Sequence, residues 1–530
     1  MNLRLTGGAM QVWSDLDGAH GPGPVRGAVL VPLLATATGR TLVVGPLDPA
    51  LVDAVPVDDL TVLVRGVPDA EALAAARPKV TVWCGGPEEL TGEPPFDTVI
   101  ALDGLGRLCS TEGAELPWGE TFALLAAAVR PGGRLLLAVE NHLGLHRLVA
   151  LPPEPTDSDW ADPGEYDPTR PAGLPRVLAT LTRAGFTPVR AYTGWPSPVA
   201  PAALLGPDLL ADESVLGYLQ ATLGPVCAPT DTVLTDPDRL LSGALRHGAA
   251  TDLAPAWILV ADSLDADRTG GSAADRAGGS GTDRAGVAAP GVGRPADELP
   301  EALLAAGAGH VEVSADPAGG WVRHEVDRVT PVPSGRTLED LLLAAALRRD
   351  LPVVRELLGG WQAGPHAGVP ADRVVVGPAG TPEAVAPAGE PMAALRRLAG
   401  RMIDGGLAHL WPSPALPGEL AQTLAVVAGR GAEPVPPAAA DEPDRPAARA
   451  YRELLVERDV LTRELAEARA KQQWYERTLT EREEALKRAR RIVALLSGTP
   501  TARAGKVLLA GARTARRTAR AAVRRMRSDD

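Results

Sequence analysis

The chain has 530 residues, which is too long for a single compact core, so we expect two or three domains joined by linkers. Hydrophobic residues make up 45% of the sequence and charged residues 22%, and these ordinary values exclude a largely disordered protein. The net charge of −13 is uneven, because residues 501–530 hold nine Lys or Arg and two Asp, a net of +7 that leaves −20 for the rest. An acidic body argues against nucleic-acid binding by the main domains, since such a site needs clustered positive charge.

The cysteines and the apolar runs indicate the cellular location of the protein. Cys84, Cys109 and Cys227 are odd in number and lack metal-ligand spacing, so reduced thiols are expected rather than disulfides or a metal site. The start of the chain, MNLRLTGGAMQVW, lacks the apolar core of a signal peptide, and no run of eighteen apolar residues occurs. We therefore expect a cytoplasmic location, with any membrane contact being peripheral.

Between residues 40 and 263, short β-rich runs alternate with helical stretches. The seven runs are 41–45, 61–66, 79–86, 96–104, 133–140, 187–194 and 256–263. The stretches DPALVDAV, DAEALAAAR, WGETFALLAAAVR and LPRVLATLTRAG lie between them and are apolar at helical spacing. Several runs are apolar on both faces, as parallel strands covered by helices are. The pattern predicts a doubly wound α/β sheet.

Two segments of biased composition divide the rest of the chain. Residues 264–298 repeat (A/T)DR units with Gly and Ser, and residues 431–446 are Pro-rich, so both are predicted linkers. Between them, residues 299–430 predict a second, smaller α/β-like module that includes the hairpin VEVSADPAGGWVRHEV.

A long helix is predicted from 447 to 496. With position a at Tyr451, eleven of the fourteen a and d positions are apolar, and no Pro or Gly interrupts the run. This pattern favours a coiled coil that self-associates or binds a helical partner. The alternative is a single solvated helix docked on its own protein.

The C-terminal segment, residues 497–530, is a basic tail. Its part from 505 to 527 places Arg residues three and four positions apart, which would give a helix one continuously basic face and a thin apolar face. Such a helix suits an anionic membrane surface. A disordered solubilising tail is the alternative.

Glycines or polar residues follow five of the predicted strands. In a doubly wound sheet, ligands bind outside the carboxyl ends of the strands, near the point where the strand order reverses. The residues at these ends are Gly45-Pro46-Leu47, Arg65-Gly66, Gly85-Gly86, Asp103-Gly104 and Glu140-Asn141-His142. They outline a crevice for a nucleotide-like ligand, although glycine also ends strands in proteins that bind nothing there.

One block makes the pattern specific. PPFDTVIALDGLGRL, the helix after it and VRPGGRLLLAVEN together resemble the fourth and fifth strands of class I S-adenosylmethionine-dependent methyltransferases. The continuation ENHLGLHRL, with LPRVLATLTRAGFTPVRAYTGWPSP and AWILVADS, is similar to a subgroup of that family found with cell-surface polysaccharide and glycosyl-transfer genes. The resemblance covers about residues 25–263. It implies a Rossmann-like seven-strand sheet, with AWILVADS antiparallel beside TPVRAYTG.

The first two strands depart from that family. The family has an acidic residue in the first strand and a G-x-G-x-G loop after it, where this chain has Val43 and the single glycine of Gly45-Pro46-Leu47. The second strand of the family ends in a carboxylate for the ribose hydroxyls, but here Arg65 stands there and has no acceptor to offer. Asp103 is the best remaining polar candidate near the adenine. By resemblance, S-adenosylmethionine would lie across Gly45, Pro46, Leu47, Arg65, Asp103 and Gly104.

The polar cluster after the fifth strand supplies catalytic candidates. Glu140, Asn141 and His142, with His146 nearby, would lie where an acceptor enters, and His has a suitable ordinary pKa for a general base. The structural alternative is that Asn141 caps the next helix and the histidines lie on its surface.

Residues 299–430 also resemble, faintly, the layout of aminoglycoside-phosphotransferase-like kinase domains. That family places an H-x-D-x-x-x-x-N loop and a metal-binding Asp around the strand that corresponds to DRVVVGPAG, and this chain has no recognisable metal-ligating pair there. We interpret the module as structural or as a decayed binding domain.

Two functions therefore remain. The first is an S-adenosylmethionine-dependent methyltransferase that acts on a glycan or another small polar acceptor. The second is a catalytically inactive pseudo-methyltransferase, an interaction scaffold whose coiled coil recruits a partner. The intact fourth and fifth strands favour the first function, and the degenerate first loop favours the second.

Overall fold

The computed structural model describes the chain from residue 2 to residue 526 with gaps. The described ranges are 2–18, 21–150, 167–228, 233–264, 295, 298–307, 309–325, 328–404, 407, 410, 416–431, 451–498 and 500–526. The predicted linkers at 264–298 and 431–446 lie almost entirely outside these residues. The chain forms two compact units, Met1–Arg452 and Glu453–Asp530, which are described separately.

All seven predicted strands form, and they are neighbours in one sheet. They are β2 (Thr41–Val44), β3 (Leu60–Val64), β4 (Thr81–Cys84), β5 (Phe96–Ala101), β6 (Val129–Glu140), β7 (Phe186–Trp195) and β9 (Ala256–Ser263). Their spatial order is β4-β3-β2-β5-β6-β9-β7, and the first five are parallel. β9 is antiparallel to both β6 and β7, which confirms the expected pairing of AWILVADS with TPVRAYTG. The strand order reverses between β2 and β5, so the carboxyl ends of these two strands mark the expected binding crevice.

The sheet is larger than seven strands. Within the described residues it has thirteen strands, because β1 (Leu3–Leu5) pairs with β4 at one edge and five more strands follow β7 at the other. These five are β8 (Ala203–Leu205), β10 (Ala302–Ala306), β11 (Gly309–Ala315), β12 (Trp321–Glu325) and β13 (Arg328–Pro331). The predicted hairpin forms as β11 and β12. Because β10 pairs with both β11 and β8, strands from before residue 264 and after residue 298 belong to the same sheet.

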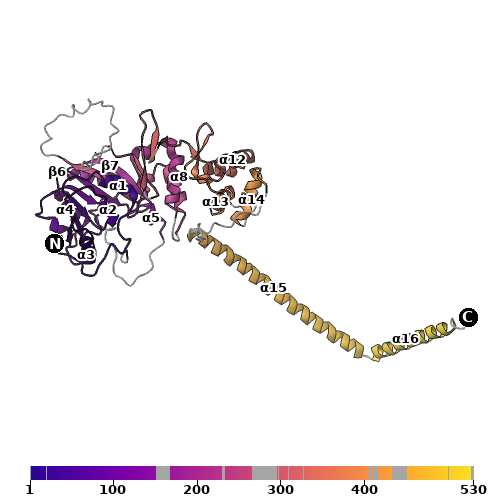
Figure 1. Ribbon diagram of the computed structural model, residues 1–530. Coiled ribbons are helices and arrows are strands. Elements are labelled where there is room, and N and C mark those ends of the chain that lie inside the picture. Colours follow the sequence, from indigo (N-terminus) through magenta and orange to yellow (C-terminus); the bar gives the residue numbers. More distant parts are fainter. Residues whose placement is uncertain are drawn as a thin grey trace. The chain divides into compact units, whose positions relative to one another are not determined.

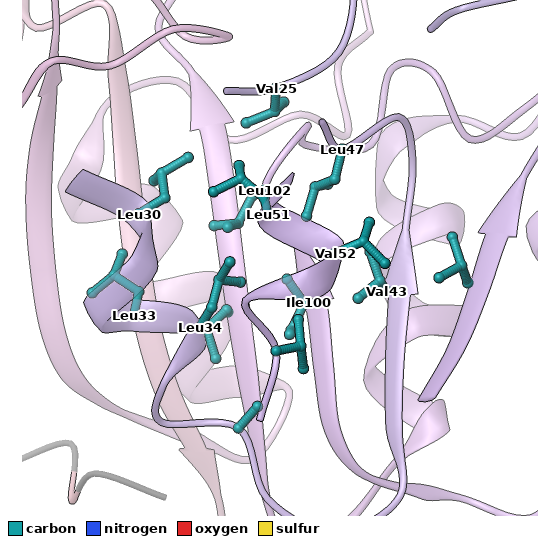
Figure 2. Packing of buried hydrophobic residues seen from close by; sticks show 14 of the residues in the cluster. Val25, Leu30, Leu33, Leu34, Val43, Leu47, Leu51, Val52, Ile100 and Leu102 are labelled. Atoms are coloured by element: carbon teal, nitrogen blue, oxygen red, sulfur yellow. The ribbon is translucent and has the colours of Figure 1, made fainter. Parts of the chain in front are cut away.

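Helices cover both faces of the sheet (Figure 1). They are α1 (Val31–Leu34), α2 (Pro49–Asp53), α3 (Val67–Ala76), α4 (Trp118–Ala128) and α6 (Leu174–Arg183). One buried cluster joins Leu33 and Leu51 to Ile100, and a second joins Phe122 and Leu181 to neighbouring strands. Figure 2 shows part of the first cluster, where Val25 lies beside Leu47 and Leu102. Two apolar cores on opposite faces confirm the doubly wound α/β arrangement.

Further helices pack beside the extended part of the sheet, around a third buried cluster. They are α5 (Leu145–Leu148), α7 (Pro207–Ala211), α8 (Leu216–Val226), α9 (Pro237–Arg246) and α10 (Ala250–Leu253).

Residues 336–427 form a mainly helical cluster with its own core. Its elements are β14 (Arg336–Thr337), α11 (Leu338–Leu347), α12 (Leu351–Ala363), β15 (Val374–Val376), β16 (Pro382–Ala384), α13 (Pro391–Asp404) and α14 (Pro417–Val427). Arg401 on α13 bonds Glu339 on α11 at 2.7 Å and also pairs with Asp238 on α9. This buried network ties the helical cluster to the helices beside the sheet.

The second unit holds α15 (Tyr451–Gly498), except for its first two residues, and α16 (Pro500–Met526). α15 is one unbroken helix over the segment predicted as a coiled coil, and α16 covers the basic tail. None of the helices in the described part of the chain is long and apolar enough to cross a membrane.

Candidate functional site

The loops after β2 and β5 touch each other where the strand order reverses. Gly45 has a φ of 88°, a left-handed conformation that favours glycine, and it turns the chain directly after β2. A Cβ added to Gly45 would lie 3.1 Å from Cβ of Asp103, which follows β5. The structure therefore brings together two of the predicted cofactor residues, but they lie against each other and leave no gap between their loops.

The segment 21–27 packs over the loop after β2. The amide of Val25 donates to the carbonyl of Pro46 at 2.8 Å, and the amide of Asp48 donates back to the carbonyl of Val25 at 2.8 Å. Val25 is 1% exposed and Leu47 is 2% exposed. Figure 2 shows the two side chains in the same apolar cluster as Leu102. Pro46 and Leu47 are thus part of the hydrophobic core.

The segment 6–18 covers the end of β3 in the same way. The amide of Met10 donates to the carbonyl of Arg65 at 2.8 Å. The Arg65 guanidinium binds both carboxylate oxygens of Asp15, with Nε–Oδ2 at 2.7 Å and an Nη–Oδ1 distance of 2.8 Å, and it donates a third bond to the carbonyl of Cys109 at 3.0 Å. It also lies over the ring of Trp13. Arg65 is therefore held inside the protein.

Two carboxylates near the end of β3 are buried and already hydrogen-bonded. Burial alone would raise the pKa of Asp15, but the Arg65 guanidinium outweighs it and lowers the pKa below its usual range. Asp69 accepts from the hydroxyl of Ser14 and from the amides of Asp15 and Leu16, while burial raises its pKa. Neither carboxylate is presented to a ribose.

Asp103 is also committed to a partner within the chain. Its carboxylate forms a bidentate pair with Arg107, with one Nε–Oδ2 distance of 2.9 Å, and Arg107 donates further to the carbonyl of Gly23 at 2.8 Å. The Asp103 side chain is 2% exposed. Burial raises its pKa to about 6, against the opposing effect of Arg107.

In this arrangement the residues do not fit S-adenosylmethionine. A cofactor at this edge needs backbone donors after β2 and an accessible acceptor after β3. Gly45 donates its amide to the carbonyl of Leu63, Pro46 has no amide hydrogen, and Asp48 donates to Val25. Residues 6–18 and 21–27, together with Leu63 and Arg107, occupy the hydrogen-bonding groups that a ligand at this edge would use.

A separate polar cluster lies at the end of β6. The Glu140 carboxylate accepts from Nε2 of His146 at 3.1 Å and from Nε of Arg147 at 2.8 Å. Arg170 donates to the Glu140 carbonyl at 3.0 Å. Burial would raise the pKa of Glu140, but His146 and Arg147 outweigh it and lower the pKa to about 2. A carboxylate with so low a pKa is a weak general base near neutral pH.

Asn141 has a structural role, but it does not cap the next helix as the alternative interpretation expected, because the N-cap of α5 is Gly144. It is 4% exposed, and its amide nitrogen donates to the carbonyls of Asp252 and Ala254 at 2.6 and 2.9 Å. Its side-chain oxygen accepts from the amide of Leu143 at 3.0 Å, so Asn141 closes a turn, whereas α5 begins after Gly144. His142 lies in that same turn and is half-buried.

Sequence reasoning missed the N-terminal segment. Trp13, Asp15 and Val25 belong to no motif, and Asp15 is one of several acidic residues in an acidic chain. One signal was present: an arginine at the end of a strand that is otherwise apolar requires a nearby carboxylate if the strand is buried. Arg65 at the end of β3 is such a residue, and its carboxylate partner is Asp15.

No protein-family model matches the chain, and no curated protein does. Several of the solved structures that it resembles are methyltransferases. The CcbJ methyltransferase from Streptomyces caelestis is 15% identical, over 48% of this chain and 94% of that one, with a TM-score of 0.25. The N-methyltransferase NodS from Bradyrhizobium japonicum WM9 is 11% identical, over 45% and 93%, with a TM-score of 0.23.

The [4+2]-cyclase SpnF is similar as well, at 16% identity over 44% of this chain and 80% of that one, with a TM-score of 0.24. At such identities and TM-scores these likenesses decide nothing about activity. The residues at the edge of the sheet are the evidence that bears on function.

Proposed function

We propose that this protein keeps the sheet of a methyltransferase and uses it as a non-catalytic interaction scaffold. The observation behind this proposal is the closed edge, where the N-terminal segment bonds to the ends of β2 and β3 and where Arg65 and Asp103 are paired inside the protein. The partner surface would be α15, whose apolar side chains are exposed. The buried cores then serve to hold this surface rather than to bind a cofactor.

A second function has its own support. The strand order, with an antiparallel β9 inserted beside β6, suits an S-adenosylmethionine-dependent methyltransferase, and the Glu140–His146–Arg147 cluster lies at the rim where an acceptor would approach. A glycan or another small polar acceptor suits such a polar rim. This function requires residues 6–27 to leave the carboxyl edge before the cofactor enters.

Calorimetric titration of the full chain with S-adenosylmethionine distinguishes the two. A scaffold with a closed edge gives no saturable heat up to about 1 mM ligand. A dissociation constant in the micromolar range would contradict the scaffold and favour the methyltransferase.

The variant Asp15→Asn tests whether the cofactor site has been lost or is only covered by the N-terminal segment. The amide cannot neutralise Arg65, so the N-terminal segment is held less firmly over β3. If the variant binds the cofactor and the parent chain does not, the segment is a removable cover over a working site. If neither binds, the scaffold proposal stands.

A further inference from the structure

The second unit exposes an apolar stripe along α15. Its a and d positions with described side chains from the second heptad on are Arg458, Leu461, Leu465, Ala468, Gln472, Tyr475, Leu479, Arg482, Leu486, Ala489 and Val493. The large apolar members of this stripe are between 51% and 65% exposed. A stripe of this length on one helix is the seam of a coiled coil, and its burial against another helix removes apolar surface from water.

The charges beside the stripe favour a parallel over an antiparallel orientation of a second helix. In a parallel, in-register pair, a g residue faces the e residue five positions later on the other helix. Glu464 then meets Arg469, and Lys471 meets Glu476, each twice across the pair. The other g and e positions of the repeat bring no like charges together.

Antiparallel pairs that overlap the same heptads satisfy fewer charges. They place Arg469 opposite Glu476 or Glu483, according to the register, and leave Lys471 opposite an uncharged residue. The register that aligns Leu461 with Val493 also sets Glu476 against its own copy, which is destabilising.

Two of the three polar members of the seam, Gln472 and Arg482, fit the same arrangement, whereas Arg458 at an a position faces its own copy near the start of the helix. In a parallel pair Gln472, at an a position, faces Gln472 of the other copy, and a single polar a residue of this kind fixes register at some cost in stability. Arg482, at a d position, lies next to Glu483 at the following e position, so the facing helix offers it a carboxylate.

From these positions we infer that α15 pairs with α15 of a second copy of this chain, parallel and in register. This inference deepens the proposed function, because it names the partner through which the scaffold assembles. The two are tested apart: cofactor binding concerns the sheet, and pairing concerns α15 alone.

Disulfide trapping in the full-length chain tests the geometry. Ala468 is a d residue, so Ala468→Cys places two thiols opposite each other only in a parallel, in-register pair. Ala470→Cys is the matched control, since this alanine lies two residues further on at the outer f position. Both variants also carry Cys109→Ser, which removes the half-buried native thiol from the cross-linking reaction. Cys84 and Cys227 are buried and are left unchanged.

Under mild oxidation we expect Ala468→Cys to convert to a covalent dimer and Ala470→Cys to stay largely monomeric on denaturing gels. Sedimentation of the unmodified chain should give twice the chain mass of 54.9 kDa. A mass of one chain at tens of micromolar would overturn the inference. A dimer whose Ala468→Cys variant does not cross-link faster than Ala470→Cys would overturn the parallel register.

A charge exchange supplies an independent test. Lys471→Glu replaces two opposite-charge contacts with two like-charge contacts against Glu476, and we expect dimer dissociation to become about tenfold more favourable. The double variant Lys471→Glu with Glu476→Lys restores opposite charges and should recover the original dissociation constant. Equal dissociation constants for all three chains would contradict the g–e pairing.

Discussion

Asp15 and Arg65 form an ion pair that is mostly out of water, with side chains 5% and 14% exposed. Removing one partner of such a pair leaves the other charge buried without compensation, which costs more than the pair itself contributes. The Asp103–Arg107 pair belongs to the same class. At the scale of the residue, these pairs are what keeps the carboxyl edge closed.

We therefore expect Asp15→Ala to lower the free energy of unfolding by roughly 3–5 kcal/mol, measured by urea denaturation. Asp58→Ala is the matched control, because Asp58 is exposed, and its effect should stay within about 0.5 kcal/mol. Similar losses in both variants would mean that Asp15 does not hold the N-terminal segment.

Glu140 makes a contribution that depends on pH. Its pKa in the folded chain is about 2, below the ordinary 4.5, so its stabilisation is complete above pH 4.5 and is lost as the pH falls toward 2. Because the side chain is about one third exposed, we expect Glu140→Gln to cost roughly 1–2 kcal/mol at pH 6. The cost should shrink clearly at pH 3. An equal cost at both pH values would show that the pairs with His146 and Arg147 do not shift the titration of Glu140.

At the scale of the element, the seven main strands could be predicted because each contains a short apolar run that lies between turn residues. β8 and β10 could not, since each is short and apolar in ways that helices and loops share. Their pairing with one another depends on a long-range contact across residues 206–301. The hairpin of β11 and β12 was found from local turn chemistry, but its place in the main sheet follows from that same contact.

The site was predicted less well than the strands, for a related reason. The residues after each strand follow from local pattern, so Gly45, Arg65, Asp103 and Glu140 all lie at the expected edge. What covers the loop after β2 and Arg65 after β3 comes from residues 6–18 and 21–27, whose fit depends on distant contacts that no spacing encodes.

α16 presents a basic face that suits an anionic surface. Its described cations, Arg503, Lys506, Arg513, Arg516, Arg517 and Arg520, recur mostly at three- and four-residue steps. We expect vesicles with anionic lipid to co-sediment the chain, with about 1 kcal/mol lost for each of Arg513, Arg516, Arg517 and Arg520 changed to Gln. Binding should fall steeply with salt and be absent on neutral vesicles. Equal sedimentation of the fourfold variant and the parent would remove α16 from any membrane role.

At the scale of the whole molecule, buried ion pairs join parts that are distant in sequence. Arg401 bridges Glu339 and Asp238, so the helical cluster of 336–427 is tied to α9 and through it to the sheet region. Because these parts share contacts, we expect the first unit to unfold in a single transition.

We expect Arg401→Ala to lower the free energy of unfolding of the first unit by roughly 3–5 kcal/mol while its urea transition stays single. Arg355→Ala, at an exposed position on α12, serves as the control and should be nearly neutral. A second transition in the parent chain would show that the helical cluster unfolds independently of the sheet.

Hydrogen exchange measures the closed edge most directly. The amides of Met10, Val25 and Asp48 are donors that hold the N-terminal segment against the ends of β2 and β3. We expect them to exchange as slowly as the amides of β3 and β5, and about 1 mM S-adenosylmethionine should leave their rates unchanged. Exchange of these amides within seconds, or protection of the loop after β2 on adding S-adenosylmethionine, would contradict the closed edge.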